Sequence, residues 1–409
     1  MNYLMAIVAL LLPTYLIRFN ILGIPTTLLE VLIYICVIFG LFNLKKARKI
    51  AWQYWLPAVL MLLAALISSL ISPEKMAALG QFKAFFLDPI LVFVLILTFL
   101  KEDDFLLILN GLMGSSLIVS FYSIYQKITG QLTVDGRIVG IFGYSPNYPA
   151  LFLGPIIGLI VAHNLELMTK RVESRHKTIK LIIGWLAVIA GFIAIYLSAS
   201  RGVLLALLGG LGFYLIMHFW SVIREKLFLK IGLGILILVV AFVSWSVFKP
   251  NFALSPAAGS RVTSSNNIRW QIWQTSLELG RKHPILGLGL ANYQNEFNKL
   301  TKDRVNFPEY ITPWALSSHN VFLMFWLSTG LLGFASFIWV LIVVFQKGCQ
   351  EFKNSHAIEI MTATIILLLQ GLIDTPYFKN DLSLIFWFLV GSMLLLITSK
   401  TKKIESSQS

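Results

Sequence analysis

Residues 181–220 read LIIGWLAVIAGFIAIYLSASRGVLLALLGGLGFYLIMHFW, two apolar runs separated by a single arginine, Arg201. Each run is about 20 residues long, the length that an α-helix needs to cross a hydrocarbon core of about 30 Å. Only a helix satisfies its own backbone groups within such a run. The stretch therefore predicts two membrane-spanning helices, 181–198 and 202–220, joined by a tight turn that contains Arg201.

Similar apolar runs recur along the whole chain of 409 residues. Hydrophobic residues make up 57% of the chain and charged residues 13%, whereas a soluble domain has roughly 25% charged residues. We expect an all-α integral membrane protein, a single polytopic domain (1–409) with about twelve transmembrane helices. The predicted spans are 3–17, 24–43, 53–71, 84–100, 104–125, 147–165, 181–198, 202–220, 229–248, 320–345, 357–374 and 382–399.

Basic residues gather in alternate connections between these spans, and this asymmetry predicts the orientation. Because cytoplasmic loops collect Lys and Arg, both termini are expected in the cytoplasm. The basic residues lie in short loops, so nucleic acid is not an expected partner. The residues concerned are Lys45, Lys46, Arg48, Lys49, Lys101, Lys170, Arg171, Arg175, Lys177, Lys180, Arg224, Lys226, Lys230, Lys347, Lys353, Lys400, Lys402 and Lys403.

The connection 249–318, between the ninth and tenth spans, is far longer than any other. The orientation places it outside the cytoplasm, and its surplus of Lys and Arg indicates a negatively charged ligand, since long loops are exempt from the charge rule. An amphipathic helix that starts within Ser264–Asn267 is expected to lie on the membrane surface. A second amphipathic piece is expected at 291–300.

Three residues at the predicted outer boundary are candidates for catalysis: Arg201, Arg269 and His319. An interfacial arginine is often only a snorkelling side chain, and a lone histidine at a helix start is often structural. The functional alternative is a guanidinium for bidentate phosphate contact and a general base whose pKa lies near neutral pH. No metal-ligand cluster or phosphate-binding loop occurs on this side, so we expect no metal and no cofactor.

A set of short motifs, taken in order, resembles the O-antigen ligase and O-antigen polymerase superfamily of bacterial membrane glycosyltransferases. The resemblance covers most of the chain, although no single motif is specific. The motifs are Gly136-Arg137, Gly140-x-Phe142, Pro146-Asn147, Ser200-Arg201-Gly202, Arg269 with Trp273, His283-Pro284-Ile285-Leu286-Gly287-Leu288-Gly289, Ser318-His319-Asn320 and Gly330-Leu331-Leu332-Gly333.

The resemblance implies a GT-C-like enzyme of the bacterial cytoplasmic (inner) membrane that takes glycan from an undecaprenyl diphosphate carrier on the outer face. The paired arginines of the family correspond to Arg201 and Arg269. Its histidine corresponds to His319, which would either deprotonate the acceptor hydroxyl or hold the diphosphate. The implied partners are the lipid-linked donor, a glycan or lipid acceptor and the membrane lipids. Four further residues are candidates for substrate binding on position alone: Arg137, Tyr144, Asn147 and Asp374.

The sequence leaves several activities open. A ligase, a polymerase and a protein O-glycosylating enzyme are not separated, and some members of the superfamily were named as bicarbonate transporters. A solute transporter would be expected to show internal repeats and interrupted helices near the membrane midplane. We find no convincing repeat, and ionisable residues avoid the centres of the spans, so the sequence favours an inverting, metal-independent glycosyltransferase.

Overall fold

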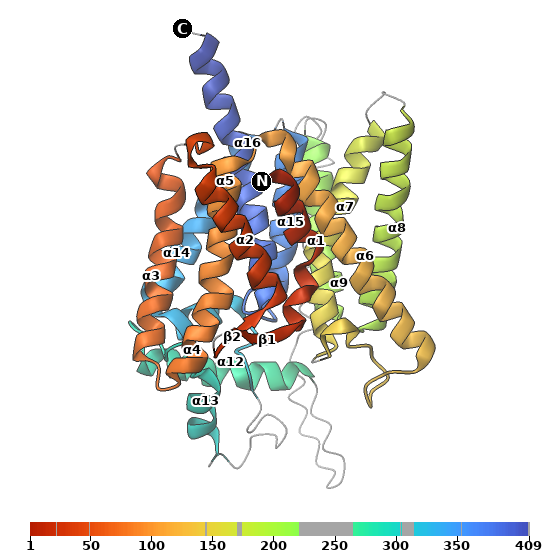
Figure 1. The fold of residues 1–409 in the computed structure, drawn as a ribbon. Coiled ribbons are helices and arrows are strands. Elements are labelled where there is room, and N and C mark those ends of the chain that lie inside the picture. Colours follow the sequence, from red (N-terminus) through yellow and green to blue (C-terminus); the bar gives the residue numbers. More distant parts are fainter. Residues whose placement is uncertain are drawn as a thin grey trace.

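The protein is a bundle of long helices in a computed structural model (Figure 1). The structure describes residues 1–21, 23–48, 50–143, 145–169, 174–220, 265–302, 304, 315–352 and 354–407. Among these residues, seven helical segments are long and apolar enough to cross a membrane. They are Trp52–Ile71, Lys75–Phe99, Glu102–Ile128, Asn147–Thr169, Arg175–Leu197, Arg201–His218 and Val321–Gln350.

Three shorter apolar helices complete this set: Leu28–Phe42, Ser355–Gly371 and the apolar part of the last helix, Asn380–Leu396. The prediction of an α-helical membrane protein is confirmed. The number of spans stays a prediction, because the ninth predicted span, 229–248, lies outside the described residues. The main helices are α2 Leu28–Phe42, α3 Trp52–Ile71, α4 Lys75–Phe82, α5 Asp88–Phe99, α6 Phe105–Thr129, α7 Asn147–Thr169, α8 Arg175–Leu197, α9 Arg201–His218, α14 Val321–Gln350, α15 Ser355–Gly371 and α16 Asn380–Ser407.

The N-terminal region differs from the predicted spans 3–17 and 24–43. Helix α1 (Asn2–Leu10) ends before a 3-10 helix, Leu12–Leu16. Pro13, near the start of that 3-10 helix, lacks the N–H that a continuing α-helix would need. The chain then forms an antiparallel hairpin, β1 (Arg18–Ile21) with β2 (Ile24–Thr27).

Two helix starts also differ from their predicted positions. Helix α2 begins at Leu28 because Thr27 and Glu30 form a capping box there. The predicted span 84–100 begins earlier, at Lys75, and a π-helical turn (Lys83–Leu87) connects α4 to α5.

Helices α7 and α15 pack closely along their length. Gly154 and Gly158 lie one turn apart on α7, and a Cβ at either position would meet the side chain of Gln370 or Ile366, respectively, on α15. Small residues at this spacing let two membrane helices approach closely. The packing aligns the start of α7 with the end of α15.

Helix α14 is interrupted at Gly330, whose φ is +66°. At this interruption, backbone groups of α14 bond to the segment that follows α12 (Ser265–Lys282). The Leu288 N–H donates to Leu327 O (2.7 Å), and the Leu331 N–H donates to Ile285 O (2.9 Å). A Cβ on Gly330 would lie 2.3 Å from Ile285 O. The glycines of this region therefore let the backbone of the segment after α12 pack directly against the backbone of α14.

Helix α12 lies across one end of the bundle, next to α13 (Tyr293–Thr301) and the β1–β2 hairpin, whereas the C-terminus lies at the opposite end (Figure 1). Ile268, Ile272 and Leu279 are buried on one side of α12. The two predicted amphipathic helices are present as α12 and α13. They form a cap at the end of the bundle that the sequence predicts to be outside the cytoplasm.

Candidate functional site

His319 and Asp374 form an ion-pair contact at the capped end of the bundle. His319 directly precedes α14, and its Nδ1 atom lies 3.4 Å from Oδ1 of Asp374, in the loop between α15 and α16. The backbone near His319 is tied on two sides: the Trp273 indole N–H donates to His319 O (3.1 Å), and the Asn320 side-chain amide donates to Leu372 O (3.0 Å). The histidine thus connects α12, α14 and the end of α15.

The backbone of His319 is strained, with a φ of +46°. A left-handed conformation is uncommon for a residue with a side chain, and such strain persists where the surrounding structure enforces it. The Asn320 side chain caps α14 by accepting from the Leu323 N–H (3.0 Å). The cap and the Trp273 contact hold the imidazole beside Asp374.

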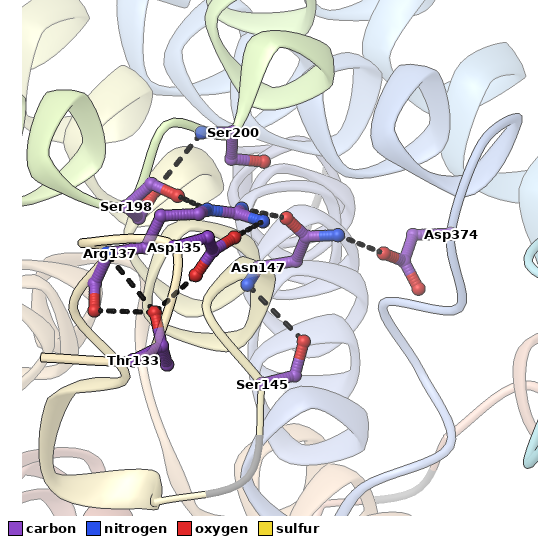
Figure 2. A network of polar contacts seen from close by, with 8 residues as sticks. All are labelled: Thr133, Asp135, Arg137, Ser145, Asn147, Ser198, Ser200 and Asp374. Atoms are coloured by element: carbon purple, nitrogen blue, oxygen red, sulfur yellow. Dashed lines mark hydrogen bonds and ion pairs between the residues drawn. The ribbon is translucent and has the colours of Figure 1, made fainter. Parts of the chain in front are cut away.

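A polar chain leads from Asp374 to the turn between α8 and α9 (Figure 2). The Asn147 amide donates to Oδ2 of Asp374 (3.4 Å), and its Oδ1 accepts from Arg137 (2.8 Å). The Arg137 Nε–H donates to Ser198 O (2.7 Å), in the turn before Arg201. The structure therefore brings His319, Asp374, Asn147 and Arg137 into one connected chain.

Arg269, on α12, also interacts electrostatically with this group. Burial lowers the pKa of Arg137 below its ordinary value; Asp135 opposes this shift, and the positive charge of Arg269 adds to it. Burial would raise the pKa of the Asp374 carboxyl, but His319 and Arg269 outweigh it and hold that pKa below its ordinary value. The site thus keeps a carboxylate ionised among several basic groups.

Two predicted residues stand apart from the chain. Arg201 is the first residue of α9, and its exposed side chain makes no hydrogen bond or ion pair with the described residues. Ala199, two residues before it, has a φ of +53°, so the turn that presents Arg201 is strained as well. Tyr144 lies outside the described residues.

A cavity of about 440 Å³ opens beside the polar chain. His319, Asp374 and Asn147 line it. Apolar residues on its wall include Phe85, Leu151, Leu316, Met324, Phe378 and Leu382. The cavity therefore combines polar groups with an apolar surface, as ligand sites commonly do.

Sequence reasoning missed Lys379 and Tyr148, which line this cavity, and Asp381, which is buried behind it. Lys379 lines it and lies over the Tyr148 ring, with Nζ 5.5 Å from the ring centroid. Tyr148 also lines the cavity, and its hydroxyl donates to Oδ1 of the buried Asp381 (2.5 Å). The sequence did contain one indication of a site here, because two ionisable residues, Lys379 and Asp381, directly precede an apolar run.

Metal binding at the cavity finds no support in the described part of the chain. Among the described residues, histidine and carboxylate ligand atoms come together instead at the other end of α7 and α15. The cavity offers hydrogen-bond donors and positive charge instead.

Comparison with known proteins bears on one part of the chain. Residues 186–338 match a family model described as O-antigen ligase. This match confirms the resemblance to the O-antigen ligase and polymerase superfamily. The matched stretch contains Arg201, Arg269 and His319, whereas Arg137, Asn147 and Asp374 lie outside it. No curated protein matches the chain.

Proposed function

We propose that this protein transfers glycan from an undecaprenyl diphosphate carrier to an acceptor hydroxyl on the outer face of the bacterial cytoplasmic membrane. The family match supports a membrane glycosyltransferase of the O-antigen ligase or polymerase kind. The observation that carries the proposal is the chain His319–Asp374–Asn147–Arg137 at the edge of a partly apolar cavity. A GT-C-like arrangement is part of the proposal.

His319 acts as the general base. Its Nδ1 atom lies 3.4 Å from Oδ1 of Asp374, so the carboxylate electrostatically favours a proton on Nδ1, and Nε2 is then the atom that accepts a proton. The acceptor hydroxyl gives its proton to Nε2, and its oxygen forms a bond to the anomeric carbon of the donor sugar. The bond from that carbon to the phosphate oxygen breaks, and undecaprenyl diphosphate leaves with the electron pair. A single displacement of this kind inverts the anomeric configuration.

Arg201 and Arg269 stabilise the charge that develops on the leaving diphosphate. Guanidinium groups bind phosphate oxygens in pairs, so two of them can supply this stabilisation without a metal. The exposure of Arg201 leaves its side chain available to a ligand. Arg137 acts as a positioning residue, because its Nε–H holds the turn that presents Arg201.

The cap formed by α12 and α13 favours transfer over hydrolysis. Tyr293 and Gln294 of α13 line the cavity together with Leu316 and His319. Exclusion of water from a closed site suppresses the side reaction with water. The apolar wall of the cavity suits the first units of a polyprenyl chain.

The test is transfer from a purified undecaprenyl diphosphate glycan in detergent, with the release of lipid diphosphate measured. We compare the wild type with His319→Ala, and with His283→Ala as a matched control, because the His283 side chain is exposed on the same end of the bundle. We expect a loss of at least about 100-fold in His319→Ala alone. Absence of turnover in a well-folded wild type, with several donors and acceptors, would favour a solute transporter and call for flux measurements.

A further inference from the structure

A second ionisable cluster lies on α7 and α15, at the ends of these helices opposite the cavity. Oε2 of Glu359 lies 3.1 Å from Nδ1 of His163 and 2.9 Å from Nδ1 of His356. Asn147 and His163 are separated along α7 by about 24 Å, at 1.5 Å per helical residue. The cluster is therefore distinct from the site that contains His319.

The ligand atoms of the cluster are close enough to share one ion. One donor atom from each of His163, His356 and Glu359 lies within 4.8 Å of the others. Zinc bonds to imidazole nitrogen and carboxylate oxygen at about 2.0–2.2 Å, so neighbouring ligands of a tetrahedral ion lie about 3.3–3.5 Å apart. The observed separations of 3.1 and 2.9 Å need an adjustment of only a few tenths of an ångström.

The burial of Glu359 requires a compensating positive charge. Its side chain is fully buried, and Oε1 has no hydrogen-bond partner within the described residues. A buried carboxylate is costly unless it is paired or coordinates a metal. Nδ1 of each histidine lies within hydrogen-bond distance of the same Glu359 oxygen, so the three possible ligand atoms are close together.

We propose that His163, His356 and Glu359 bind a divalent transition metal, with Zn²⁺ as the best match. Two imidazole nitrogens and one carboxylate oxygen are a ligand set that zinc accepts, with a fourth position left for water. Hard cations such as Mg²⁺ prefer all-oxygen ligands and fit less well. The ring of Phe105, 5.2 Å from that of His356, covers one side of the cluster.

The proposed ion would connect α7 to α15 directly. Both helices also carry or adjoin the cavity residues, since Asn147 begins α7 and Asp374 follows α15. A ligand that binds the folded protein but not the unfolded chain raises the thermal stability of the protein. Zn²⁺ should therefore raise the unfolding temperature, whether or not the protein transfers glycan.

The experiment is equilibrium dialysis of the chelator-treated, full-length protein against Zn²⁺ in detergent, with the bound metal counted by mass spectrometry. We expect one bound Zn²⁺ per chain in the wild type, and binding at least tenfold weaker in Glu359→Gln and His163→Asn. His176→Ala is the matched control, because His176 is an exposed histidine at the same end of the bundle. It should bind as the wild type does.

Two results would overturn the proposal. One is a folded wild type that takes up no Zn²⁺ and shows no rise in unfolding temperature, which would assign the cluster to hydrogen bonding alone. The other is a double variant, His163→Asn with His356→Asn, that binds Zn²⁺ as the wild type does. The first result comes from the wild type, so a variant that fails to fold does not affect it.

Discussion

Oδ1 of Asp374 lies 3.4 Å from Nδ1 of His319, while its Oδ2 accepts from the Asn147 amide. One carboxylate thereby orients the proposed base and links it to Arg137. The arrangement has the form of a nucleophile-activating pair, in which a third group orients the base. It joins the α6–α7 loop region, the start of α14 and the end of α15.

Replacement of Asp374 by Asn should lower stability in a pH-dependent way. The folded pKa of Asp374 lies below its ordinary value of 3.8. The carboxylate therefore stabilises the fold fully above about pH 4 and loses this effect as the pH falls through the folded pKa. We expect the unfolding temperatures of wild type and Asp374→Asn to differ at pH 7 and to approach each other as the pH falls below about 4. An equal gap at pH 7 and pH 3 would contradict this role.

Replacement of Asn147 by Asp should impair transfer more than replacement by Ser. The aspartate keeps an acceptor for Arg137 but places a second carboxylate against Asp374, where the amide now donates. Two adjacent carboxylates raise the pKa of one of them. We expect kcat of Asn147→Asp to fall about tenfold or more at neutral pH and to recover in part at lower pH. A pH profile parallel to that of Asn147→Ser would argue against this coupling.

Lysine substitutions should separate Arg201 from Arg137. The Arg201 side chain makes no hydrogen bond or ion pair with described residues that a lysine would remove. Arg201→Lys should therefore keep the unfolding temperature, while the rate of transfer falls about 100-fold. Arg137 donates in two directions, to Ser198 O and to Asn147, so Arg137→Lys should lower both transfer and the unfolding temperature. Near-normal transfer by folded Arg201→Lys would remove Arg201 from the diphosphate site.

The junction at Gly330 should tolerate no side chain. Gly330→Ala places a Cβ 2.3 Å from Ile285 O at a positive φ, and we expect destabilisation of about 2 kcal/mol or more. Gly212→Ala is the control, because nothing lies within 4 Å of its added Cβ. Thermal unfolding of both purified variants measures the difference. Equal unfolding temperatures would show that α14 does not depend on this contact.

The order of helices was predictable from sequence because it depends on local properties. An apolar run of the right length must become a helix in a membrane, whatever its neighbours are. The same holds for the amphipathic α12, whose described part, Ser265–Lys282, follows the expected helix. The hairpin β1–β2 was missed, because apolar residues on either side of it conceal a short break in hydropathy.

The site was predictable only as a set of residues. Asn147 and Asp374 are 227 positions apart, and their contact follows from the close packing of α7 against α15 at Gly154 and Gly158. The burial of Asp381 and the cluster at Glu359 arise in the same way, from neighbours on other helices. Local sequence properties specified most of the helical segments, though not the break after α1 or the β1–β2 hairpin, and the residue types expected on the outer side. Tertiary structure alone decided which of those residues meet, because contacts between helices depend on side-chain packing that no single segment specifies.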